Sequence, residues 1–221
     1  MIKINETAKI SPNCDIEDST RGSSIEIGAD STIDSFVKFK PAGGKGDIKI
    51  GERVYINSCC VLYSGNGICI GDDVLISANC TLAPVNHEYT NKSKKISSQG
   101  HASSKGGVTI EDNVWIGSNV TVEKATIDST VISDNVKIDD LVHVGHNSFL
   151  GSYSQITVAS IIAGRARVGK KCWIAPNCVI DNGCVIGDEC LVGTHSLVRK
   201  SFESNCIIAG SPARVLKKFK N

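Results

Sequence analysis

The most constraining feature of this sequence is an apolar residue that recurs every six positions. Between Ile132 and Val198 it forms twelve consecutive hexads without interruption. Shorter runs of three hexads precede this block, and together they give twenty-seven hexads whose first position is always Ile, Leu, Val or Phe. Repeats of this kind are typical of solenoids, in which each unit buries its apolar side chains only by stacking on its neighbours.

The grouping of the hexads in threes predicts the shape of the solenoid. Three hexads make one coil of eighteen residues, each hexad being a short strand followed by a bend, so that the leading side chains stack into a continuous core. We therefore predict an all-β triangular prism of about nine coils. The extra residues between the triplets number five, five, two, twenty-two and four. The register places all of them at one corner, and the largest is a polar loop over residues 88–109.

The cysteines and glycines follow the same period. Seven of the ten cysteines occupy position five of a hexad, where a thiol fills an interior slot as a small apolar group. The four cysteines between Cys172 and Cys190 are spaced by six and diverge onto three faces, which argues against a tetrahedral metal site. Nine of the twenty-one glycines directly follow the leading residue, where we expect the missing Cβ to permit a sharp bend.

Composition excludes some classes of function. The net charge of +1 gives no general argument for nucleic acid or an anionic membrane as partner. No run of eighteen apolar residues is present, and the start MIKINETAKISPN lacks the apolar stretch of a signal peptide. We therefore expect a cytoplasmic protein whose cysteines stay reduced.

The hexads IGDDVL, IEDNVW and VIGDEC resemble those of the hexapeptide-repeat acyltransferases, and the resemblance covers nearly the whole chain. It implies a left-handed parallel β-helix over residues 1–203, with an extended corner loop and a short C-terminal cap over residues 204–221. For the basic end of the chain, a solvated helix over the last coil is the plainest interpretation. The resemblance further implies a homotrimer with sites between subunits, acetyl-CoA as co-substrate and no metal.

The segment LAPVNHEYTN and the later DNVWIG resemble the sugar O-acetyltransferases related to galactoside, maltose and xenobiotic acetyltransferases. This resemblance implies that His87 is the general base and that Asn57 binds the acceptor or orients the site. It further implies that Trp115 and Tyr89 contact the acceptor and that Ser118 meets coenzyme A. Imidazole titrates near neutral pH, so it can remove the hydroxyl proton as the oxygen attacks the thioester. The prediction is direct transfer of an acetyl group from acetyl-CoA to a hydroxyl of a sugar or glycan.

The second half of the chain offers an alternative. The segment IDDLVHVGHNSFLG resembles the N-acyltransferases that act on nucleotide-linked amino sugars. That resemblance makes His146 the base, with the substrate-binding His143 beside it. By the register, His87 and His146 lie on the same face, two coils apart. A metal-binding or structural trimer like the γ-class carbonic anhydrases is a further alternative, but His143 and His146 should lie on neighbouring faces without an evident third ligand. His101 and His195 are interpreted as surface groups.

The end of the chain, CIIAGSPARVLKKF, resembles the terminal segment of these transferases, where a Gly-x-Pro-Ala turn borders the adenylate of coenzyme A. Basic side chains there are suited to the phosphates. Small residues in the last coils would let the pantetheine arm run close to the backbone. The coenzyme-binding residues so implied, besides Ser118, are Ala175, Gly193, Lys200, Pro212, Ala213, Arg214 and Lys217.

Overall fold

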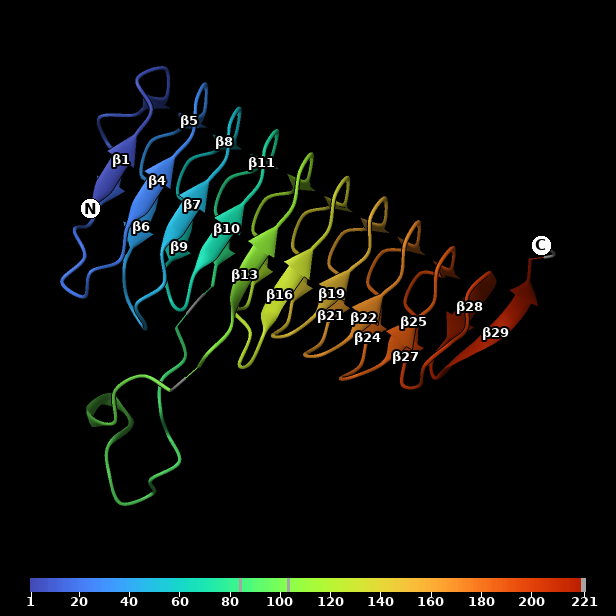
Figure 1. The fold of residues 1–221 in the computed structure, drawn as a ribbon. Coiled ribbons are helices and arrows are strands. Elements are labelled where there is room, and N and C mark those ends of the chain that lie inside the picture. The colour runs from blue at the N-terminus through green and yellow to red at the C-terminus, as the bar shows by residue number, and fades with distance from the viewer. Residues whose placement is uncertain (84, 103, 220–221) are drawn as a thin grey trace.

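A computed structural model describes residues 1–83, 85–102 and 104–219. The chain winds into a long triangular prism that runs from the N-terminus, blue in Figure 1, to the C-terminus, red. Three parallel sheets form its sides.

The first sheet contains nine strands, which follow one another in the order β1 (Ile2–Ile4), β4 (Ile25–Ile27), β7 (Ile48–Ile50), β10 (Ile68–Ile70), β13 (Gly107–Ile110), β16 (Ser129–Ile132), β19 (Phe149–Leu150), β22 (Arg167–Val168) and β25 (Val185–Ile186). The second sheet contains β2 (Lys9–Ile10), β5 (Thr32–Ile33), β8 (Tyr55–Ile56), β11 (Leu75–Ile76), β14 (Trp115–Ile116), β17 (Lys137–Ile138), β20 (Gln155–Ile156), β23 (Trp173–Ile174) and β26 (Leu191–Val192), followed by β28 (Cys206–Gly210) and β29 (Ala213–Lys218). The third sheet contains β3 (Asp15–Ile16), β6 (Lys38–Lys40), β9 (Val61–Tyr63), β12 (Thr81–Leu82), β15 (Thr121–Val122), β18 (His143–Val144), β21 (Ile161–Ile162), β24 (Val179–Ile180) and β27 (Leu197–Val198).

The leading residue of every hexad lies in one of the strands β1 to β27, so the predicted register is confirmed. From the second coil onward these side chains form one buried core, in which Ile56 and Leu62 are typical with 0% exposure. In the first coil, which has a neighbour on one side only, Ile4 remains 43% exposed. The fold is a left-handed parallel β-helix of nine coils, as predicted.

The bends and the close stacking of the coils depend on different positions of the hexad. The residue with left-handed backbone is the fourth of the hexad, and it is mostly not glycine; Asn113 (φ 54°) and Asn147 (φ 60°) are examples. Asparagine tolerates this conformation better than most residues. The glycine after the leading residue serves a different purpose, because a Cβ built on Gly145 would lie only 2.7 Å from the nitrogen of Gly164 in the next coil. Our bend interpretation of these glycines was therefore wrong, and close stacking of the coils requires them.

All five interruptions leave the prism between the third and the first sheet, as the register predicted. We call this edge the loop corner. The largest interruption, residues 83–106, is the long loop, which projects far from the prism in Figure 1 and contains one short 3₁₀ helix, η1 (Ile96–Ser98). Strand β13 already begins at Gly107, so the loop starts and ends a few residues earlier than the sequence indicated.

The cysteines at position five fill interior slots, as expected. Cys60, Cys80 and Cys178 are fully buried. Their thiols donate weak hydrogen bonds to carbonyl groups of the next coil, as from Cys178 Sγ to the Gly193 oxygen at 3.1 Å. These thiols are packing groups of the core.

The C-terminal segment is not a helix. Strand β28 extends the second sheet beside β26, and β29 folds back on β28 as an antiparallel hairpin. In β28 the side chains alternate, with Cys206 and Ile208 buried over the last coil, which is the period of a strand and not of a helix. The cap predicted from the sequence is therefore a β-hairpin.

Candidate active site

His146 is held in one tautomer by its neighbour Asn147. The Oδ1 atom of Asn147 accepts hydrogen bonds from the backbone N–H and the hydroxyl of Thr126, at 3.0 and 2.8 Å. A backbone N–H can only donate, so this contact identifies the amide oxygen of Asn147. The same oxygen lies 3.2 Å from Nδ1 of His146, which must therefore carry the hydrogen. Nε2 is left with a lone pair and is the basic atom of the ring.

The position of the ring is set by Gly164 in the following coil. A Cβ built on Gly164 would lie 2.8 Å from both Cδ2 and Cε1 of His146, and closer still to Nε2. The half-buried imidazole thus lies flat over a residue that has no side chain. This close packing leaves the ring little freedom to rotate.

A carboxylate connects the two histidines of this segment. Glu123 accepts a hydrogen bond from the backbone N–H of His146 at 3.2 Å, and its other oxygen lies 3.9 Å from Nε2 of His143. His143 projects from β18 in the third sheet, and His146 follows that strand at the loop corner. We expected these two histidines on neighbouring faces, and Glu123 contacts both residues. The carboxylate can stabilise a positive charge that develops on the ring of His143.

An open cavity of about 360 Å³ lies next to Asn147, the residue that follows His146. Asn147, Arg165 and Arg167 line one side of it, and residues 126–129 line the other. The guanidinium of Arg167 stacks on the ring of Phe149 at 4.5 Å, which fixes its direction. A base next to two arginines suits a substrate that carries negative charge away from its reacting atom.

His87, the base favoured by the sequence, lies on the long loop. It follows the third sheet two coils before His146, as expected, but it is exposed and carried off the prism. Its ring packs edge-on against His101, with the ring centres 5.0 Å apart. Tyr89, predicted to contact the acceptor, is 71% exposed on the same loop.

The residues predicted to accompany His87 lie elsewhere in this chain. Trp115 projects from β14 in the second sheet and borders a cavity of about 550 Å³ with Leu75 and Tyr153. Asn57 follows β8 and accepts a hydrogen bond from the N–H of Ser58 at 2.7 Å, which is the role of a turn residue. Within one chain, the structure does not bring Asn57 and Trp115 to His87.

The predicted coenzyme residues fall into two groups. Lys200, Pro212, Ala213 and Arg214 line one cavity of about 430 Å³ together with Arg199, at the C-terminal end of the prism. The other group follows strands of the second sheet and contains Ser118, Ala175 and Gly193. Lys217 lies in β29, paired with Ile207. The structure therefore gathers four of the predicted residues in a basic pocket.

Sequence reasoning missed Glu123 and Gly164, which complete the surroundings of His146. They lie 23 residues before and 18 residues after it, so no local motif includes them. The signal was present in the register, because Gly164 is one coil of eighteen residues further along and must stack on His146. Among the described residues, no group of three His, Cys, Asp or Glu side chains is placed to hold a metal ion. The described helices include none that is long and apolar enough to cross a membrane.

Comparison with known proteins finds two families that match parts of the chain. The family described as bacterial transferase hexapeptide (six repeats) matches residues 165–200, and the hexapeptide repeat of succinyl-transferase matches residues 107–139. No curated protein matches the sequence.

Several solved structures share the fold. The UDP-N-acetylglucosamine acyltransferase from Campylobacter jejuni is similar with a TM-score of 0.65 and 20% identity, over 98% of this chain and 75% of that chain. The UDP-N-acetylglucosamine O-acyltransferase from Moraxella catarrhalis gives a TM-score of 0.58 and 21% identity, over 97% and 74% of the two chains. The UDP-N-acetylglucosamine acyltransferase from Arabidopsis gives 0.54 and 21%, with the same coverage of 97% and 74%. At these identities the similarity concerns the fold.

Proposed function

We propose that this chain is a hexapeptide-repeat acyltransferase and that it transfers an acyl group from acyl-coenzyme A to the amino group of a nucleotide-linked sugar, with His146 as the general base. The observation that carries this proposal is the fixed tautomer of His146, whose Nδ1–H is held by Asn147 so that Nε2 is free to accept a proton. A general base needs this arrangement. The arginines that line the neighbouring cavity favour an acceptor that carries negative charge, as a nucleotide-linked sugar does.

The reaction follows from the chemistry of these groups. The amino nitrogen attacks the carbonyl carbon of the thioester while Nε2 of His146 takes the proton that the nitrogen loses. The carbon–sulfur bond then breaks, and the imidazolium returns the proton to the thiolate of coenzyme A. An amide and free coenzyme A are the products. Glu123 accepts a hydrogen bond from the backbone N–H of His146 and so helps to hold that residue in place.

We assign the coenzyme to the basic pocket of Lys200, Pro212, Ala213 and Arg214, where the cationic side chains suit its phosphates. The acyl group is proposed to be acetyl. The resemblance to the hexapeptide-repeat acyltransferases supports a homotrimer, in which a second copy would cover the open side of the cavity beside Asn147.

A second candidate is acetyl transfer to a carbohydrate hydroxyl with His87 as the base. It is favoured by the packing of His101 against His87, which restricts a ring that would otherwise be free on an exposed loop. We rank it second because no acceptor atom fixes the tautomer of His87 among the described residues.

The test is an acceptor panel with acetyl-CoA that contains UDP-linked amino sugars, free amino sugars and neutral sugars. Products are identified by mass spectrometry, and treatment with hydroxylamine cleaves an ester but leaves an amide intact. We expect an amide on a nucleotide-linked amino sugar. A hydroxylamine-labile product on a neutral sugar would overturn the proposal in favour of the second candidate.

A further inference from the structure

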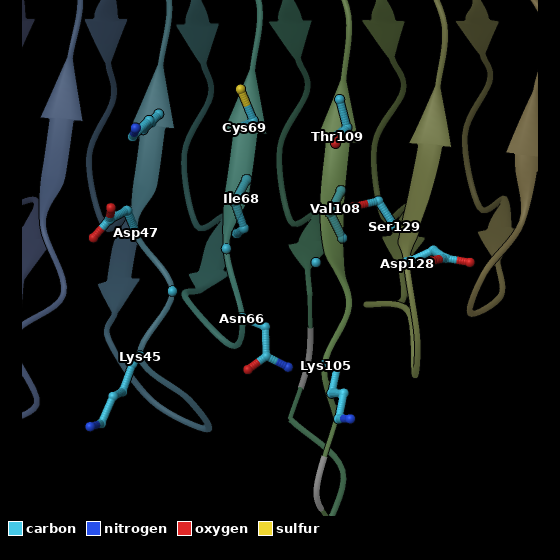
Figure 2. Close-up of a pocket in the computed structure, with 14 residues that line it drawn as sticks. Lys45, Asp47, Asn66, Ile68, Cys69, Lys105, Val108, Thr109, Asp128 and Ser129 are labelled. Atoms are coloured by element: carbon cyan, nitrogen blue, oxygen red, sulfur yellow. The ribbon is translucent and has the colours of Figure 1, made fainter.

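A second groove lies on the first sheet beside the loop corner. It has a volume of about 400 Å³, and Lys45, Lys49 and Lys105 are among the residues that line it. We call it the lysine groove. Figure 2 shows Lys45 and Lys105 on either side of the amide of Asn66, with Cys69 and Thr109 further along the sheet. Three lysines against two carboxylates, Asp47 and Asp128, leave the groove with a net positive charge, which favours an anion.

Three glycines are among the residues that line the lysine groove, and we call the stretch that they form its floor. Gly46, Gly67 and Gly107 stack in three successive coils, and a Cβ built on Gly46 or Gly107 would collide with the backbone of Gly67. The amide of Asn66 is held by the carbonyl of Ser104 at the base of the long loop. The glycines therefore allow the coils to stack closely along this part of the groove.

Directly behind this floor lies a buried cation. Lys124 is 4% exposed, and its Nζ atom has no hydrogen-bond partner among the described residues. Its Cδ atom would lie 3.2 Å from a Cβ built on Gly65, next to Asn66 and Gly67 of the floor. The neighbouring hydroxyl of Ser64 is likewise buried and unpaired. A buried ammonium without a partner is costly, so the interior here is short of negative charge.

From these observations we propose that the lysine groove binds the diphosphate of a nucleotide, with Lys45 and Lys105 on the phosphate oxygens and Lys124 as a buried counter-charge beneath the floor. This inference rests on the proposed function in one respect, since we take the nucleotide to be that of the acceptor. Coenzyme A also carries a diphosphate, and the experiment below separates the two sources.

The position of the lysine groove relative to His146 fits this assignment. Asp128 and Ser129 line both the lysine groove and the cavity beside Asn147, so the two are adjacent. Lys105 precedes β13 and Asn147 precedes β19, which are two strands apart in the first sheet. Two strand spacings amount to about 10 Å. A sugar attached to the diphosphate can extend over this distance toward His146.

The test measures binding and not turnover. Calorimetric titration of the full chain with UDP and with pyrophosphate gives Kd for the wild type, Lys45→Ala, Lys105→Ala and Lys124→Met. Lys9→Ala, which removes an exposed lysine of the first coil, is the matched control. We expect each of the three groove variants to weaken UDP binding by about tenfold, the effect of one charged contact, and Lys9→Ala to leave it unchanged.

Cys69 provides a local probe in the same samples. It is an exposed thiol that lines the lysine groove, and the exposed Cys59 lies outside it. UDP should protect Cys69 from iodoacetamide and leave the labelling of Cys59 unchanged. Equal labelling of both thiols at saturating UDP would contradict the proposal, as would UDP affinities that do not respond to the lysine substitutions.

Two further comparisons identify the source of the diphosphate and distinguish failure of this inference from failure of the proposed function. If coenzyme A, and not UDP, protects Cys69 and loses affinity in Lys45→Ala, the assignment to the acceptor nucleotide is wrong. His146→Ala should bind UDP with wild-type affinity. UDP binding at the lysine groove without any acyl transfer would refute the proposed function and leave this inference standing. If the chain does transfer an acyl group to a nucleotide-linked sugar, but Lys45→Ala and Lys105→Ala leave the KM for that sugar unchanged, the proposed function stands and this inference is refuted.

Discussion

The packing of His146 on Gly164 predicts that a single methyl group at position 164 removes activity without unfolding the chain. In Gly164→Ala the new Cβ would lie 2.8 Å from two ring carbons of His146. Carbon atoms in contact prefer about 3.5 to 4.0 Å, so the ring must move by about 1 Å. The backbone of Gly164 is not in the left-handed region, so alanine brings no strain of its own there.

The expected size of the effect follows from that displacement. A misplacement of about 1 Å in a catalytic group costs about 100-fold in rate, which corresponds to about 2.7 kcal/mol in the barrier. The assay is release of the coenzyme A thiol with the acceptor found in the panel, together with thermal unfolding of the same samples. We expect kcat to fall by about 100-fold while the unfolding temperature stays within a few degrees of the wild type.

A double-mutant cycle supplies the control. Once His146→Ala has removed the ring, the methyl group at position 164 has nothing to displace, so adding Gly164→Ala should cost almost nothing more. Long-range ¹⁵N spectra of the imidazole should also show the Nδ1–H tautomer in the wild type and its loss in Gly164→Ala. A Gly164→Ala enzyme with full kcat would refute the role of His146, as would additive losses in the double mutant.

Three other predictions concern neighbouring features. Asn147→Ala removes the acceptor for Nδ1–H of His146 and should lower kcat by about 100-fold through loss of ring position; unchanged kcat in steady-state assays would speak against the fixed tautomer. Burial lowers the pKa of Lys124 below its usual 10.5, so the unfolded chain binds that proton more readily, and stability should rise with pH up to the unfolded pKa. Lys124→Met should abolish this rise and raise the free energy of unfolding at pH 7 by about 1 to 3 kcal/mol; urea titrations at pH 7 and pH 10 measure both, and a less stable variant would contradict the reasoning. Among the ten cysteines only Cys59 and Cys69 are exposed, and burial raises the pKa of Cys14 and of Cys206 to about 11. Ellman's reagent should therefore find two thiols that react fast in the native protein. Three or more fast thiols would show that the core thiols are accessible.

The fold could be predicted almost completely from the sequence because every hexad must meet the same physical requirement. An apolar residue every six positions must point inward, and three hexads close a coil, so the register of Ile132 fixes that of Val198. The period could not reveal the reason for the bends. The left-handed position four carries residues as different as Asn113 and Tyr153, so its conformation is imposed by the coil and not by residue type.

The candidate site was harder to predict because it depends on side chains from three coils. The local segment VGHN identifies His146 and Asn147, and the register adds Gly164 once coils of eighteen residues are stacked. Glu123 is different, since the four extra residues that follow its hexad place it more than one coil of eighteen residues before His146, which it contacts. His87 was favoured because the long loop and Trp115 accompany it in the sequence, but such a pattern does not show which partners a side chain has in the structure.

The most direct test of this account compares two variants in one assay. With acetyl-CoA and a nucleotide-linked amino sugar, His146→Ala should lower kcat by at least 100-fold, within the range expected for loss of a general base, while His87→Ala should stay within about twofold of the wild type. If His87→Ala is inactive and His146→Ala turns over normally, the catalytic base lies on the long loop and the central claim is wrong.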